Sequence, residues 1–127
     1  MNVLFVCAHG GAKSIMAASY FNRLAEEQAL PYAATAVSAE DPYEAVPAPV
    51  ADLLLRDGDD VRAFTPRPVE PRDVGDAARI VTIGCELAGA QVERWDDVPA
   101  ASDDLEGSAA AIRRHVEALI EELGARL

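Results

Sequence analysis

The chain has 127 residues, 50% of them hydrophobic, which is enough to bury the core of one compact domain. Its net charge of -11 opposes binding to a phosphate backbone, so we expect no nucleic-acid partner. Two cysteines and two histidines without close spacing argue against a metal site, and no apolar run reaches the roughly 18 residues that a membrane span needs.

The amino-terminal residues, Met1 to Val6, lack a basic region and lead directly into a polar, glycine-rich segment, which is unlike a secretory signal. We therefore expect a cytoplasmic protein that makes no membrane contact and whose cysteines are free thiols. In a chain this acidic, an anion site has to be built locally, from main-chain N–H groups and a nearby cation.

Four short apolar or alternating segments predict β-strands, and four further segments predict helices. In chain order the predicted elements are a strand at 3–6, a helix at 13–27, a strand at 32–38, a helix at about 46–57, a short helix at about 70–77, a strand at 80–83, a short strand at 91–95 and a helix at 109–123. Strands that alternate with helices predict a parallel sheet with helices on both faces. No repeat or change of composition divides the chain, so residues 1–127 are expected to form a single domain.

The first strand-to-helix connection carries the clearest chemistry. It reads Cys7-Ala8-His9-Gly10-Gly11-Ala12-Lys13-Ser14. Main-chain N–H groups in such a loop can converge on one point, and the helix N-terminus adds about half a positive charge there. The two glycines permit the tight backbone that this needs. The segment therefore predicts a site for a tetrahedral oxyanion, such as phosphate, sulfate or arsenate, with Lys13 as the nearby cation.

The same dipoles favour the ionised form of Cys7, which is then a nucleophile aimed at the central atom of the bound anion. The hydroxyl of Ser14 is placed to hydrogen-bond that thiolate. The alternative is that Cys7 is a small buried hydrophobe and that the glycines only make a turn. His9 is also open to two interpretations, as a contact to the bound anion or as a solvated loop residue.

Together with the rest of the chain, this loop resembles the signature of the low-molecular-weight tyrosine phosphatases and of the thiol-coupled arsenate reductases that share their fold. Segments with this similarity lie at 3–7, 14–18, 38–39, 65–69, 81–85, 95–96 and from 112 onward. The segment 81–85 and the short length are more similar to the arsenate reductases. The resemblance implies a three-layer α/β sandwich, phosphotyrosine phosphatase I-like, with a four-stranded parallel sheet in the order 2-1-3-4.

Lys13 departs from the family pattern, which has arginine at this position. It is the only lysine in a chain with ten arginines. Lysine keeps the positive charge but lacks the planar fork with which arginine grips two oxygens. We expect any catalysis to be impaired as a result.

The general acid of the family also has no counterpart in register. The family pattern has Asp-Pro a few residues after the tryptophan that matches Trp95, whereas this chain continues with Asp96, Asp97, Val98 and Pro99. Asp97 is the nearest replacement, followed by Asp96, and either would protonate a leaving group if the loop bends to suit. The alternative is a solvated acidic loop.

Cys85 follows the third predicted strand. The resemblance to arsenate reductases implies that it attacks the arsenylated Cys7 and forms a disulfide with it. The further cysteine that those enzymes use is missing, because residues 86–91 contain none. A two-cysteine reaction then needs a low-molecular-weight thiol or a thioredoxin-like protein as reductant and no bound cofactor. The alternative is a buried thiol at a strand end.

Three functions follow from these residues. The first is an arsenate reductase-like enzyme with Cys7 as nucleophile, Lys13 as anion clamp and Cys85 as resolving thiol. The second is a phosphatase acting on phosphotyrosine or small phosphomonoesters. The third is an oxyanion-binding domain of the same fold without turnover.

Overall fold

The computed structural model describes residues 1–126. Its elements in chain order are β1 (Asn2–Cys7), α1 (Lys13–Glu27), β2 (Ala33–Ser38), α2 (Ala48–Arg56), α3 (Pro71–Asp76), β3 (Ala77–Ile83), β4 (Glu93–Trp95) and α4 (Leu105–Ala125). The four strands run parallel in the order β2-β1-β3-β4. The predicted α/β class and sheet order are thereby confirmed.

The strand β1 lies inside the sheet because it is apolar on both faces. Its residues 3–6 are fully buried. It pairs with β2 from Asn2 opposite Ala33 to Cys7 opposite Ser38, and with β3 along its other edge. Since parallel strands end on the same edge of a sheet, the residues that follow β1, β2 and β3 meet there.

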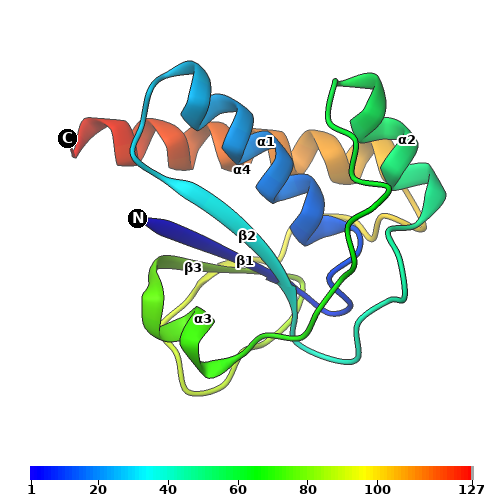
Figure 1. The fold of residues 1–127 in the computed structure, drawn as a ribbon, viewed down its shortest axis with the longest axis horizontal. Helices are drawn as coiled ribbons and strands as arrows, with labels where there is room; N and C mark the ends of the chain where they lie inside the picture. The colour runs from blue at the N-terminus through cyan, green and yellow to red at the C-terminus, as the bar shows by residue number, and fades with distance from the viewer. Residues whose placement is uncertain (127) are drawn as a thin grey trace.

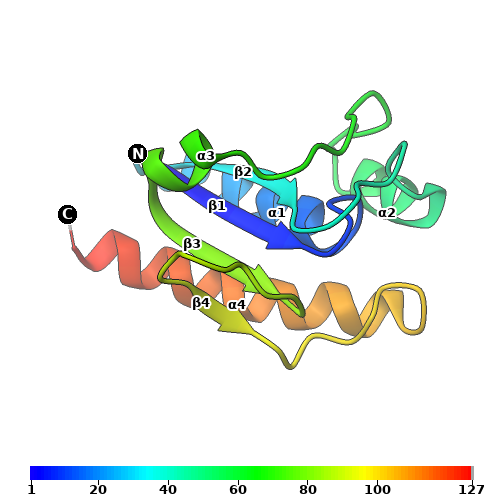
Figure 2. The same ribbon diagram turned by 90° about the horizontal axis from the view of Figure 1, so that it is seen from below.

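Helices cover the two faces of the sheet unequally. The helices α1 and α4 pack together over one face, while the short α3 lies on the other (Figure 1). Figure 2, seen from below, shows α4 running along the sheet behind β4, with α3 on the opposite side, nearer the viewer. Helices on both faces were predicted from the sequence. In the described chain, the only helix on the second face is α3, which is 6 residues long.

The alternation of side chains along β1 determines on which face of the sheet the side chain of Cys7 lies. Val3, Phe5 and Cys7 belong to the large core that packs beneath α1 and α4, whereas Leu4 and Val6 belong to the smaller core on the opposite face. The side chain of Cys7 therefore lies on the α1 side of the sheet.

Several boundaries differ from the predicted ones. The last helix begins at Leu105 rather than 109, because the Asp104 carboxylate caps it and accepts a hydrogen bond from the Gly107 N–H at 2.9 Å. The third strand begins at Ala77 instead of 80, directly after α3. The fourth is shorter than predicted, at Glu93–Trp95. Among the helices of residues 1–126, none combines the length and apolar character needed to cross a bilayer.

Candidate active site

The loop between β1 and α1 is held against the segment that follows β2. The N–H of Ala39 donates to the Cys7 carbonyl and the N–H of Glu40 to the Ala8 carbonyl, both at 2.9 Å. Gly10 has a φ of 68°, and a Cβ there would lie 3.1 Å from both the N and the Cβ of Ser38. The backbone conformation of residue 10 and the closeness of β2 thus both favour glycine there.

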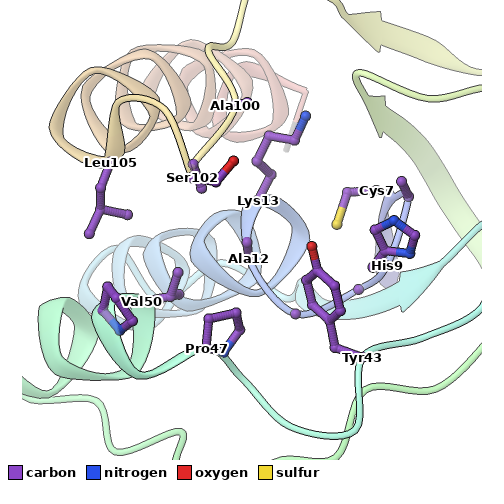
Figure 3. Close-up of a pocket in the computed structure, with 15 residues that line it drawn as sticks. Cys7, His9, Ala12, Lys13, Tyr43, Pro47, Val50, Ala100, Ser102 and Leu105 are labelled. Carbon is purple, nitrogen blue, oxygen red and sulfur yellow. The ribbon is translucent and has the colours of Figure 1, made fainter.

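A pocket of about 450 Å³ opens over this loop (Figure 3). Its floor is formed by residues 7–13. Its walls come from the segment before α2 and the first turn of α2, and from the segment before α4 and the first residue of α4. They are mostly apolar: Tyr43, Pro47, Pro49, Val50, Ala100, Ala101, Ser102 and Leu105. No carboxylate side chain lines it within residues 1–126. The loop therefore opens into a space suited to an organic group.

Cys7 and Ser14 are joined at the base of this pocket. Cys7 is 3% exposed and Ser14 is fully buried. The Sγ of Cys7 lies 3.1 Å from the Oγ of Ser14, and the Ser14 N–H donates to the same sulfur at 3.4 Å. When Cys7 is ionised, both groups of Ser14 can donate to the thiolate, which is the arrangement that favours a nucleophilic sulfur.

The main-chain N–H groups of the loop are not used by the fold. Within residues 1–126, those of residues 8–13 donate to no backbone or side-chain acceptor, whereas the next N–H, that of Ser14, donates to the Cys7 sulfur. A run of unpaired donors at the start of a helix is a suitable lining for an anion. Ala8, His9, Gly10, Gly11 and Ala12, the residues predicted to bind the anion, are thus brought together with Cys7.

Lys13 is the first residue of α1 and also lines the pocket. Its ammonium reaches the end of β3, where a Cβ on residue 84 would lie 2.6 Å from Nζ. Gly84, with a φ of 67°, leaves the room that this head group occupies. No carboxylate of residues 1–126 forms a salt bridge with Lys13, so its charge remains available to a ligand.

Cys85 lies beside the backbone of β1 but outside the pocket. Its thiol donates to the carbonyl of Val6 at 3.5 Å, and its side chain packs against the smaller core, on the face opposite Cys7. Burial raises the pKa of the Cys85 thiol, and the negative charge of nearby Cys7 raises it further. Both cysteines are free thiols in the structure.

No protein-family model matches the chain, and no curated protein matches its sequence. Solved structures do match it. YfkJ from Bacillus subtilis is 21% identical with a TM-score of 0.84, over 99% of this chain and 96% of that one. An arsenate reductase from Archaeoglobus fulgidus is 27% identical with a TM-score of 0.70, over 95% and 97% of the two chains. A low-molecular-weight protein tyrosine phosphatase from T. tengcongensis is 18% identical with a TM-score of 0.74, over 100% and 99%.

The chain has the fold of the arsenate reductases and low-molecular-weight tyrosine phosphatases. The resemblance seen in the sequence is confirmed at this level.

Asp97, the predicted general acid, is not among the residues that line the pocket. Its carboxylate accepts a hydrogen bond from His115 Nε2 of α4 at 2.7 Å, and the His115 ring stacks on Trp95 with ring centroids 4.6 Å apart. The hydrogen bond from His115 holds the pKa of Asp97 below its usual range, which is the wrong direction for a proton donor. The carboxylate of Asp96 accepts a hydrogen bond from Arg94 Nε at 3.0 Å.

His9 and Tyr43 lie together at one end of the pocket. The Nδ1 of His9 is 2.8 Å from the carbonyl oxygen of Asp41, and the two rings pack with centroids 4.8 Å apart. Tyr43 was not predicted as a site residue, because nothing in a proline-containing loop after the second strand indicates where its side chain turns. Pro47, Val50 and Leu105 were also not predicted as site residues.

The Asp97–His115 pair should make stability depend on pH. Since the pKa of Asp97 is lowered in the folded state, the pair stabilises the protein above about pH 4, where an unfolded aspartate is ionised, and this contribution is lost as the pH falls through the lowered pKa. We expect Asp97→Asn to lower Tm slightly at pH 5 and to lower it less on further acidification. Thermal unfolding between pH 3 and 6 measures this, and a difference that grows toward acid pH would contradict it.

Proposed function

We propose that the chain is an enzyme that hydrolyses phosphomonoesters, with Cys7 as the nucleophile. The observation that carries the proposal is the Cys7 sulfur, hydrogen-bonded twice to Ser14, at the floor of a pocket of about 450 Å³ with apolar walls. An inorganic anion alone would fill only the floor of such a space. The walls favour a substrate in which the oxyanion carries an apolar organic group.

The proposed reaction has two steps. In the first, the Cys7 thiolate attacks phosphorus, an S–P bond forms, and the ester P–O bond breaks with its electron pair going to the leaving oxygen, which takes up a proton. In the second, water attacks phosphorus, the S–P bond breaks and returns its electron pair to sulfur, and phosphate leaves while the water gives up a proton. Ser14, as donor to the sulfur, stabilises the thiolate at the beginning and at the end of this cycle.

Charge on the phosphoryl oxygens is balanced by the loop. The unpaired N–H groups of residues 8–13 and the ammonium of Lys13 are the donors that the floor of the pocket offers. The whole chain carries a net charge of -11, which repels an anionic substrate. The N–H groups of the loop and the Lys13 ammonium therefore have to attract the phosphoryl group more strongly than the rest of the chain repels it. The best substrates should accordingly be those whose organic part is neutral or positively charged.

The direct test is hydrolysis of p-nitrophenyl phosphate. We expect the wild-type protein to release p-nitrophenol and Cys7→Ser to release no more than buffer does, because the serine hydroxyl is not ionised at neutral pH and is a far weaker nucleophile. Thermal unfolding of both proteins shows whether the variant is folded. Equal rates for a folded Cys7→Ser and the wild type would contradict the proposal. Phosphate that raises Tm without any turnover would instead support a binding domain.

Lys13→Arg should increase the rate. The planar fork of arginine holds two phosphoryl oxygens where the ammonium holds one. We expect kcat/KM for p-nitrophenyl phosphate to rise several-fold. A lower value in a variant of unchanged Tm would mean that lysine at residue 13 has a task other than clamping the anion.

Arsenate reduction is the second candidate, and the position of Cys85 favours it. The Cys85 sulfur is 3.5 Å from the carbonyl of Val6, the residue that precedes the nucleophile. In this reaction Cys7 displaces water from arsenate to form an S–As bond. The Cys85 thiolate then attacks the Cys7 sulfur, the electron pair of the S–As bond reduces As(V) to As(III), and arsenite leaves a disulfide that a thiol must reduce. Cys85 has to turn toward the opposite face of the sheet for this step.

The variant Cys85→Ser distinguishes phosphomonoester hydrolysis from arsenate reduction. If arsenate is the substrate, the wild type with arsenate and dithiothreitol forms arsenite, and Cys85→Ser forms no more than Cys7→Ser does. Hydrolysis of p-nitrophenyl phosphate by the same Cys85→Ser protein serves as its control, because Cys85 lies outside the pocket. Arsenite formation that is independent of Cys85 would count against the two-thiol reaction.

A further inference from the structure

The pocket lacks the carboxylic acid that would give a proton to the leaving group. Within residues 1–126, none of the side chains that line it is aspartate or glutamate. The lining side chains that carry an exchangeable proton are Cys7, His9, Lys13, Tyr43 and Ser102. Since Cys7 is the nucleophile of the proposed reaction, the proton donor has to come from the other four.

Only one of these four has the chemistry for both steps of the reaction. Hydroxyl, phenol and ammonium groups hold their protons at neutral pH, so they are poorly suited to accept one from water in the second step. An imidazole both gives and takes a proton near neutrality. His9 is the single imidazole among the residues that line the pocket.

The surroundings of His9 determine which ring nitrogen exchanges the proton. Its Nδ1 lies 2.8 Å from the carbonyl oxygen of Asp41, and a carbonyl oxygen only accepts hydrogen bonds. Nδ1 therefore carries a hydrogen in both the neutral and the charged ring. Nε2, which makes no hydrogen bond to a protein atom in the described chain, is left as the nitrogen that gains and loses a proton.

The ring of His9 is also held in place. It packs against the Tyr43 ring at a centroid distance of 4.8 Å and an angle of 31°, and the Tyr43 N–H donates to the His9 carbonyl at 3.0 Å. Figure 3 shows Cys7, His9 and Tyr43 gathered at one end of the pocket. A side chain fixed through Nδ1, through its ring face and through its own main chain is oriented in advance for proton transfer.

We propose that His9 Nε2 gives its proton to the leaving oxygen in the first step and accepts the proton of the attacking water in the second. This inference rests on the proposed phosphomonoester hydrolysis. The charged imidazole becomes neutral as the P–O bond breaks and the alcohol departs. It becomes charged again when water attacks and the S–P bond breaks, so one cycle restores both His9 and Cys7.

The test compares two substrates that differ in their need for an acid. The p-nitrophenolate anion departs readily without a proton, whereas phenolate is a much poorer leaving group. The variant His9→Asn keeps an N–H near the position of Nδ1 for the Asp41 carbonyl and lacks Nε2. We expect it to lower kcat/KM for phenyl phosphate about 10- to 100-fold more than for p-nitrophenyl phosphate, within the range ascribed to general acid catalysis.

Two further variants make the result decisive. Asp97→Asn removes the competing carboxylate and should lower both rates equally, if at all. His9→Gln provides a second substitution if His9→Asn unfolds, as judged by its Tm. An equal loss on both substrates in the folded His9 variants, or a selective loss on phenyl phosphate in Asp97→Asn, would overturn the role of His9 while leaving Cys7 as nucleophile. Absence of Cys7-dependent turnover on either substrate would overturn the proposed function and this inference with it.

Discussion

Two hydrogen bonds between Ser14 and the sulfur of Cys7 fasten the first turn of α1 to the end of β1. Through them the strand, the loop and the helix meet at one atom, and the six residues between must curve around it. Within the described chain the N–H groups of those six residues donate to no protein acceptor, so the curve leaves unpaired donors in the segment that lines the pocket. These two hydrogen bonds thus bring the proposed nucleophile and the proposed anion site together.

The opposite side of the loop is fixed by the segment after β2. Main-chain hydrogen bonds from Ala39, Glu40 and Tyr43 to the loop continue the pairing of β1 with β2 beyond the sheet. The loop can approach so closely because its central residues lack side chains. A Cβ on Gly11 would lie 2.6 Å from Tyr43 Cδ2. The two glycines therefore do more than turn the chain, since Gly10 admits the backbone of β2 and Gly11 admits the aromatic wall of the pocket.

The sequence is sufficient to predict the parallel sheet and the placing of Cys7, because these depend on local patterns: an apolar strand, a glycine-rich turn and a helix with a serine in its first turn. The strand order comes from the resemblance to the arsenate reductases and phosphatases. The sequence is not sufficient to predict which residues form the walls of the pocket. Tyr43 reaches the loop through contacts between segments about 30 residues apart, which no spacing in the chain encodes. Asp97 fails as a predicted pocket residue for a similar reason, since His115, 18 residues away, competes for it.

Gly84 links two residues that otherwise belong to different parts of the site. Its lack of a side chain is what admits the Lys13 ammonium, its backbone has a φ of 67°, and the next residue, Cys85, packs against the smaller core. Residues 13 and 84 are consequently coupled through the position of the Lys13 head group. Among descendants of this sequence, a side chain acquired at position 84 would displace the cation from its place, so the two positions should be inherited as a pair.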